Sequence, residues 1–343
     1  LVRIRDVKRG YSETYYSGEY PEEYVLSAGD LLVGMDGEFN IARWKCTGAL
    51  LNQRVCKLVA KIGTNEEYLR FAMSKALKKI EQRTAFVTVK HLSAKELNKL
   101  ELDVPELSNQ DRIADILNRL ENVIEKRREE LDKLDELIKA RFVELFGDPV
   151  LNPHEWAKPE LSDLADLKIG PFGSLLHKED YIEGGHPLVN PSHIVDGRIT
   201  IDPKLTVSDE KYEELSAYQL KVGDVVMGRR GEMGRCAVVE EEGLLCGTGS
   251  LLIRPKGKVT ADYIQKIISY PTFKKTIEDM AVGQTMPNLN VSIVSEFRII
   301  SPPIEVQNSY YDFVAQVDKS KVAVQKALDE TKLLFDSLMQ QYF

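Results

Sequence analysis

The chain has 343 residues, of which 43% are hydrophobic and 29% charged, a composition typical of a soluble globular protein with two or more domains. It excludes a disordered or fibrous chain, and no apolar run approaches the roughly 18 residues that a membrane span needs. The net charge of −8 by itself argues against a nucleic-acid binder, because neutralising phosphates requires a basic surface, and only residues 1–105 carry a positive net charge.

The first part of the chain, residues 1–105, is predicted to be a small mixed α/β domain. Two short apolar strands are predicted around a Gly-Asp turn within residues 24–33. The spacing of apolar residues then predicts a helix over Glu66–Arg83, and the segment Val104–Glu106, which contains a proline, closes the domain.

A long amphipathic helix is predicted at residues 106–147. Its apolar residues recur on alternating steps of three and four, which is the pattern of a helix that packs along a partner helix. Ser108 is a candidate N-cap, and Gly147 followed by Asp148-Pro149 is predicted to end the helix. The predicted seam consists of Ile113, Leu117, Leu120, Ile124, Leu131, Leu134 and Ile138.

The same order of parts then returns. Residues 148–303 are predicted to form a second mixed α/β domain, with a strand at Val225–Met227 and a helix over Ala261–Met280. Residues 304–343 are predicted to form a second long helix with the same apolar spacing. Its predicted seam residues are Val314, Val317, Val324, Leu328 and Phe335.

The two halves form an internal repeat with a spacing of roughly 195 residues, which is too long for a solenoid. No counterpart of residues 155–187 precedes Leu1, so the first domain is expected to lack its front. Either a fragment or a gene that begins late would explain this. Corresponding pairs are Gly29 and Gly223, Asp30 and Asp224, Pro105 and Pro302, Gln110 and Gln307, and Phe146 and Phe343.

This duplication favours pairing of the two long helices within one chain, as an antiparallel coiled coil with pseudo-two-fold symmetry. Pairing between chains, as in an ordinary dimer, is the alternative left open. The predicted fold class is therefore α+β, with two mixed α/β domains separated by long helices that pair as an antiparallel coiled coil.

The sequence carries no catalytic signature. A phosphate-binding GxxxxGK[ST] loop, the Asn/Asp-Pro-Pro-Tyr/Phe motif of amino-methyltransferases and zinc-type His or Cys spacings are all absent. The glycine-rich segments 170–174 and 228–231 read as turns in which the backbone approaches a neighbour closely. We therefore predict no enzyme activity, no metal and no cofactor for this chain. The four cysteines are expected to be reduced core residues of a cytoplasmic protein, with a reversible disulfide as the alternative.

Polar loops at matching places in the two halves form the candidate recognition surface. Arg229-Arg230 lies between glycines, and the fork of an arginine suits two parallel bonds to guanine or to phosphate. Met35-Asp36 occupies the matching place in the first half, as expected of two readers of different half-sites or of two drifted surface loops. Further candidates are Arg3, Arg5, Lys90 and His91 in the first half and Asn190, His193, Thr248, Ser250, Gln284, Thr285 and Asn288 in the second.

The chain resembles the specificity subunits of type I restriction–modification systems in several motifs and in the order of its parts. The resemblance covers essentially the whole chain, although Val104-Pro105-Glu106 replaces the double proline and the first domain lacks its opening. The motifs are Gly170-Pro171-Phe172-Gly173-Ser174, His186-Pro187-Leu188-Val189, the entry from Pro302 to Gln307 into the second long helix, and Phe146-Gly147-Asp148-Pro149 at the end of the first.

The resemblance implies a chain that reads double-stranded DNA and leaves the chemistry to partners. Each mixed α/β domain would be a target-recognition domain for one half of a bipartite site, and the helices would set the spacer between the halves. Two methyltransferase (modification) subunits would use S-adenosylmethionine, and restriction/translocase subunits would use ATP and Mg. A coiled-coil protein-binding scaffold without DNA specificity is the alternative from another class.

Overall fold

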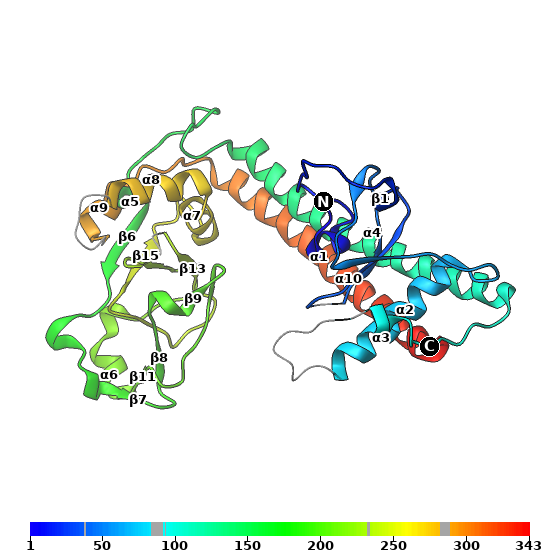
Figure 1. The fold of residues 1–343 in the computed structure, drawn as a ribbon. Coiled ribbons are helices and arrows are strands. Elements are labelled where there is room, and N and C mark those ends of the chain that lie inside the picture. The colour runs from blue at the N-terminus through cyan, green and yellow to red at the C-terminus, as the bar shows by residue number, and fades with distance from the viewer. Residues whose placement is uncertain (38, 84–91, 93, 232–233, 282–288) are drawn as a thin grey trace. The chain divides into compact units, whose positions relative to one another are not determined.

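The computed structural model describes residues 1–343 except 38, 84–91, 93, 232–233 and 282–288 (Figure 1). The chain forms two compact units. Unit 1 comprises Leu1–Asp132 and Lys321–Phe343, and unit 2 comprises Lys133–Ser320. Each unit therefore contains one globular part and a portion of both long helices. The predicted boundaries, in contrast, divide each globular part from the helix that follows it.

A four-stranded antiparallel sheet forms the centre of unit 2, in the order β13-β12-β15-β6. Val225 and Met227 of the central strand β12 pack against the helical side of the core, whereas Val226 packs in a second cluster on the opposite face. Alternate residues of a strand point to opposite faces, so an unbroken apolar run is buried on both sides. The strands are β6 (Ala165–Ile169), β12 (Val225–Gly228), β13 (Cys236–Val238) and β15 (Ser250–Pro255).

A second four-stranded sheet of unit 2 has the order β14-β8-β11-β7, and the hairpin β9-β10 stands beside these sheets. Five short α-helices complete the described residues of the globular part. The remaining strands are β7 (Tyr181–Ile182), β8 (His186–Val189), β9 (Ile194–Val195), β10 (Arg198–Ile199), β11 (Thr206–Val207) and β14 (Leu245–Cys246), and the helices are α5 (Leu161–Leu164), α6 (Asp209–Glu214), α7 (Ala261–Ile268), α8 (Pro271–Ala281) and α9 (Val291–Ser295).

Unit 1 repeats this plan with fewer strands in its described residues. Its central sheet has three strands in the order β3-β2-β5, and β1 pairs with β4. The elements are α1 (Ile4–Arg9), β1 (Val25–Leu26), β2 (Leu31–Gly34), β3 (Ile41–Arg43), β4 (Ala49–Leu50), β5 (Val55–Leu58), α2 (Glu66–Arg83) and α3 (Ala94–Leu97).

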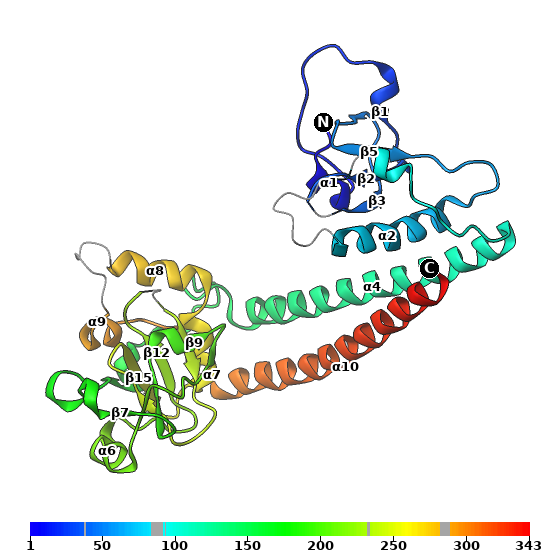
Figure 2. The same cartoon turned by 60° about the horizontal axis from the view of Figure 1, so that its bottom comes forward.

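The long helices are α4 (Leu107–Phe146) and α10 (Ile304–Tyr342). Within each unit they lie side by side (Figure 1 and Figure 2). The start of α4 packs on the end of α10 in unit 1, where Ile113 and Leu117 meet Met339. The end of α4 packs on the start of α10 in unit 2, where Phe142 meets Tyr310. The helices are therefore antiparallel, and the predicted α+β fold with paired long helices is confirmed.

Every predicted seam residue is at least partly buried. Apolar burial along one stripe is what holds such helices together, since their other faces are polar. Ile113, Leu117, Ile124, Val317, Val324 and Leu328 are buried, and Leu120, Leu131, Leu134, Ile138, Val314 and Phe335 are half-buried.

The internal repeat extends to individual hydrogen bonds. The buried amide of Gln110 accepts from Asn65 N at 2.8 Å and donates to Pro105 O at 2.7 Å. In unit 2 the buried Gln307 accepts from Thr260 N at 3.0 Å and donates to Pro302 O at 2.9 Å. Each glutamine thus joins the start of a long helix to the globular part of its own unit.

Two sequence expectations are wrong in detail. The helix expected over Ala261–Met280 is interrupted between Ile268 and Pro271, because proline lacks a backbone N–H and disfavours the helical conformation of the residue before it. Ser108 lies inside α4, which begins at Leu107, and so it is not the N-cap. In contrast, Gly147 ends α4 as expected, with φ at +71°.

Candidate nucleic-acid interface

Three segments of unit 2 converge where strands β8 and β12 end and β14 passes to β15. We call the residues of these segments, Asn190–Pro191, Arg229–Arg230 and Gly247–Gly249, the loop end of unit 2. Backbone hydrogen bonds join them: Gly247 N donates to Val189 O at 3.0 Å, and Arg229 N donates to Gly249 O at 3.1 Å. The sheet therefore presents polar side chains from distant parts of the sequence on one surface.

Glycines make this convergence possible. A Cβ added to Gly170 would lie 1.9 Å from Gly247 O, and one added to Gly247 would lie 2.7 Å from Val189 O, both backbone oxygens. Both are far below any real contact, so only glycine lets these backbones approach so closely. Segments 170–174 and 228–231 were predicted to be turns in which glycine permits close backbone approach and positive φ. Gly170 shows the close approach, and Gly173 and Gly231 have positive φ angles of +63° and +78°.

The two arginines of the loop end differ in their surroundings. Arg229 is only 7% exposed, and its Nε has no hydrogen-bond partner in the described part of the chain. Burial, and then the neighbouring charge of Arg230, lower the pKa of Arg229 from its ordinary value. Arginine nonetheless stays charged, so a buried fork beside a second cation favours an acceptor such as a phosphate or a guanine edge. Arg230 is exposed, whereas Asn190 and Thr248, from the other two segments of the loop end, are half-buried.

Two predicted recognition residues have structural roles instead. Ser250 is fully buried, and its hydroxyl donates to Val189 O at 2.7 Å. His193 is also buried, with its Nδ1 2.8 Å from Leu188 O. Both side chains fasten strand β8 to its neighbours, and neither is presented to solvent, so the expectation that they contact DNA is corrected.

The predicted residues Lys90, His91, Gln284, Thr285 and Asn288 lie outside the described residues. The residues that follow two of these segments are described. Leu289 N donates to Arg229 O at 3.0 Å, and Leu92 N donates to Met35 O at 2.7 Å. Leu92 and Leu289 therefore lie at equivalent places, each bonded to the same loop of its own unit.

Unit 1 has an equivalent loop end with different side chains. Met35, at the place of Arg229, is buried, and Asp36 forms an ion pair with Arg54 at 3.4 Å. Arg3-Ile4 occupies the place of Asn190-Pro191, since Ile4 packs on Gly34 as Pro191 packs on Gly228. Arg3 and Arg5 are exposed, and Arg5 lies 4.0 Å from Asp6.

Sequence reasoning missed Arg54, which is mostly exposed beside Asp36. The repeat could have indicated it, because Gly34 pairs with Val55 on β5 as Gly228 pairs with Ser250 on β15. Arg54 therefore stands at the position of Gly249, which belongs to the loop end of unit 2.

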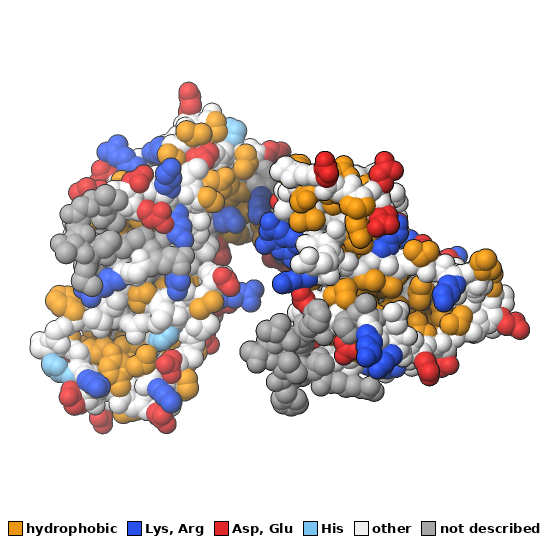
Figure 3. Space-filling model, viewed as in Figure 1, with side chains coloured by type: hydrophobic (Ala, Val, Ile, Leu, Met, Phe, Trp, Pro, Cys, Tyr) orange, Lys and Arg blue, Asp and Glu red, His pale blue; other side chains and the backbone are white. Residues whose placement is uncertain are grey.

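The visible surface carries no large field of one sign. On the face in Figure 3, lysines and arginines are interspersed with aspartates and glutamates. Over the described residues, no three His, Cys, Asp or Glu side chains gather as a metal site would require, and no helix is both long and apolar enough to cross a membrane. Local arginines, rather than a basic surface, are the feature that fits nucleic acid.

Comparison with known proteins gives one consistent result. Residues 5–135 and 153–331 match the family model of the type I restriction modification DNA specificity domain. The chain is 27% identical to the type I restriction enzyme EcoBI specificity subunit of Escherichia coli, over 100% of this chain and 79% of that protein. It is 19% identical to the MjaVIII specificity subunit of Methanocaldococcus jannaschii, over 89% of this chain and 78% of that protein.

Solved structures share the fold. The S subunit of a type I restriction–modification system from M. genitalium has a TM-score of 0.54 at 16% identity, covering 92% of this chain and 83% of that chain. The HsdS subunit from Thermoanaerobacter tengcongensis has a TM-score of 0.51 at 18% identity, covering 93% and 81%. A third structure, described as showing complex assembly and conformational transition of the type I R-M system, has a TM-score of 0.60 at 17% identity, covering 93% and 82%.

Proposed function

The chain belongs to the type I restriction–modification DNA specificity subunits, and from this premise we propose that unit 1 and unit 2 each read one half of a bipartite site in double-stranded DNA. As a specificity subunit it determines which DNA sequence the type I system recognises, and it is not itself catalytic. One observation carries the proposal of two half-sites: the same loop end occurs in both units with different side chains.

The difference between the two loop ends supports two different half-sites. Unit 2 offers Arg229 and Arg230, which suit guanine N7 and O6 or a phosphate. Unit 1 offers the Asp36–Arg54 pair, whose carboxylate is able to accept from cytosine N4. A shared scaffold that carries different hydrogen-bonding groups at one place would read different bases with the same backbone geometry.

The long helices are proposed to set the spacer and to dock the partners. Besides their buried seam, α4 and α10 expose large apolar residues, which solvent-facing helices usually avoid. We assign these to two methyltransferase subunits, which would bind S-adenosylmethionine, while restriction/translocase subunits would use ATP and Mg in the cytoplasm. The exposed residues are Leu107, Val123, Leu137 and Val143 on α4 and Val322, Leu333 and Leu334 on α10.

Selection from a random double-stranded DNA library tests the proposal, with this chain co-expressed with its methyltransferase subunit. The expected product is a split motif with a fixed gap, bound at least about 10³-fold more tightly than a scrambled site at the same salt concentration. Recovery of one half alone would mean that only one unit reads DNA. A well-formed complex that selects no motif would instead support the coiled-coil scaffold that binds only protein.

Replacing Arg230 with alanine is expected to weaken binding to the selected site by about 1–3 kcal/mol, and to relax the preference at one base position. Arg229→Lys should act in the same direction, because lysine lacks the planar fork. Arg198→Ala is the matched control, since Arg198 is exposed on β10 outside the loop end. Fluorescence anisotropy against single-base variants measures the effect; an equal loss for all sequences would identify a phosphate contact instead.

A further inference from the structure

Two neighbouring lysines of unit 2 have no acidic partner. Lys266 on α7 is half-buried, and Lys139 near the end of α4 is exposed. Within the described part of the chain, neither lysine forms an ion pair. Burial, and then the charge of Lys139, lower the pKa of Lys266 from its ordinary value. Two cations held together without a counter-charge are unfavourable in the protein alone, and they favour an anionic ligand.

Aromatic packing between α4 and the end of α7 holds the two lysines near each other. The rings of Phe142 and Tyr270 stack with their centroids 5.1 Å apart. Lys139 lies three residues before Phe142, and Lys266 lies four residues before Tyr270, so each lysine is about one helical turn from this contact. The lysine pair is therefore placed by buried contacts inside unit 2 and not by two freely moving surface side chains.

The internal repeat shows that the fold does not require a lysine at the place of Lys266. Thr260 corresponds to Asn65, since the backbone N–H of each donates to the matched glutamine, and by the same spacing Lys266 corresponds to Phe71. Phe71 is buried, and its ring centroid lies 6.1 Å from that of Phe335. An apolar ring fills this place in unit 1, so the charge of Lys266 serves something other than packing.

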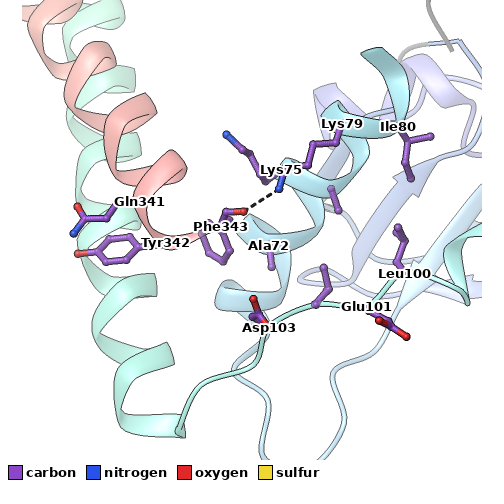
Figure 4. A pocket seen from close by; sticks show the side chains of 12 residues that line it. Ala72, Lys75, Lys79, Ile80, Leu100, Glu101, Asp103, Gln341, Tyr342 and Phe343 are labelled. Carbon is purple, nitrogen blue, oxygen red and sulfur yellow. Dashed lines mark hydrogen bonds between the residues drawn. The ribbon is translucent and has the colours of Figure 1, made fainter. Parts of the chain in front are cut away.

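The other residues of this surface also differ between the units. The place of Lys139 is taken in unit 1 by the acidic Asp336, and the place of Lys274 on α8 is taken by Lys79 on α2. Figure 4 shows Lys79 reaching the end of α10, where its Nζ donates to Phe343 O at 3.0 Å. Unit 1 therefore combines an apolar ring, an acid and a bonded lysine where unit 2 has the lysine pair.

The lysine pair is connected to the loop end of unit 2 through the chain between β12 and β13. Gly228 N, at the end of β12, donates to Arg235 O at 2.8 Å. A Cβ added to Gly234 would lie 3.5 Å from Ile268 O, so this connection passes against the end of α7, two residues from Lys266. A long anionic ligand that contacts the loop end is thus able to continue past the β12–β13 connection to the lysine pair.

A DNA strand is the anion that fits this position. Lysine binds phosphate as a point charge, and a DNA strand carries one phosphate at every step. We propose that Lys139 and Lys266 bind the phosphate backbone of the DNA beside the half-site that unit 2 reads, an inference that rests on the proposed function. Such contacts position the duplex and carry no sequence information. An acidic surface of a partner protein is the other class of ligand, and the experiment distinguishes it.

Two variants remove the charges one at a time. Lys266→Phe introduces the residue that unit 1 has at this place, and Lys139→Gln changes an exposed side chain, so both should fold, which circular dichroism verifies. Affinity for the selected site is measured by anisotropy on the complex with the methyltransferase subunit. From about 50 to about 200 mM salt, each variant should lose about 3.5-fold less affinity than the unchanged complex, because one phosphate contact contributes about 0.9 to the salt slope.

The preference for the selected site over a scrambled site should stay the same in both variants, since phosphate contacts do not read bases. Lys204→Gln is the matched control. Lys204 is exposed between β10 and β11, away from the lysine pair in the sequence and on a different element. Its substitution removes the same charge from unit 2 and should leave the salt slope unchanged.

Duplexes in which single phosphates are replaced by neutral methylphosphonates locate the contact. The unchanged complex should lose affinity when particular phosphates beside the half-site of unit 2 are neutralised. The Lys266→Phe complex should be insensitive at one of these phosphates and should respond normally at the others. A merely structural role of Lys266 would weaken binding to every duplex equally and would leave this pattern as it is.

Three results would overturn the proposal: a salt slope that neither variant changes, the same methylphosphonate pattern with and without Lys266, or loss of the methyltransferase subunit from a variant whose salt slope is intact. The last would identify an acidic protein surface as the ligand. Each of them is compatible with selection of a split motif, so the proposed function would stand. A complex that selects no motif would overturn both proposals.

Discussion

Replacing Phe146 with alanine is expected to lower the free energy of unfolding of unit 2 by about 3–5 kcal/mol. The Phe146 ring is fully buried at the end of α4 and contacts the rings of Phe142, Tyr263 and Tyr310 at centroid distances of 5.0, 5.2 and 5.4 Å. These rings come from α4, α7 and α10. The substitution therefore removes both buried area and the contact that fixes the helices to the globular part.

Urea unfolding followed by circular dichroism measures this loss. Phe343→Ala is the matched control at the repeat-related position, where the ring lies 5.1 Å from that of Tyr68 but is only half-buried. Its cost should be about half as large, because less apolar area is removed from water. Equal costs at the two positions would contradict the account of Phe146 as the centre of the aromatic cluster.

Replacing Gly170 with alanine is expected to damage the loop end of unit 2 more than any loss of a single side chain there. The new Cβ would lie 1.9 Å from Gly247 O, and neither atom belongs to a flexible side chain. The backbone must move, at a cost of roughly 3 kcal/mol in stability. Since Asn190 and Thr248 adjoin Gly247, we expect DNA affinity to fall on the order of 100-fold, the equivalent of one to two base contacts.

Gly173→Ala is the matched control within the same glycine-rich motif. An added Cβ there meets no atom within 4 Å, and only the positive φ of +63° opposes it. Its cost should stay near roughly 1 kcal/mol, with DNA affinity almost unchanged. Thermal unfolding and anisotropy on the selected DNA site measure both variants. An unchanged affinity for a folded Gly170→Ala protein would mean that the loop end does not contact DNA.

Features that repeat, or that depend on local spacing, could be predicted from the sequence. The seam of α4 and α10 follows from apolar residues at helical spacing. Gly147 ends α4 because glycine adopts the left-handed φ of +71° without strain. The equivalence of Gln110 and Gln307 indicated one architecture used twice. Local patterns suffice here because each element buries one stripe or one face.

Which polar residues reach the surface was decided only by the tertiary structure. Ser250 and His193 lie close to the loop end in the sequence, but their side chains bond carbonyls of strand β8. Arg54 gains its place beside Asp36 only because β5 pairs with β2. The sequence by itself therefore determined the family, the repeat and the helix pair, whose signals are periodic and local. The recognition residues depend on pairing between distant strands, and a polar side chain has the same sequence signal whether it bonds a buried carbonyl or faces solvent.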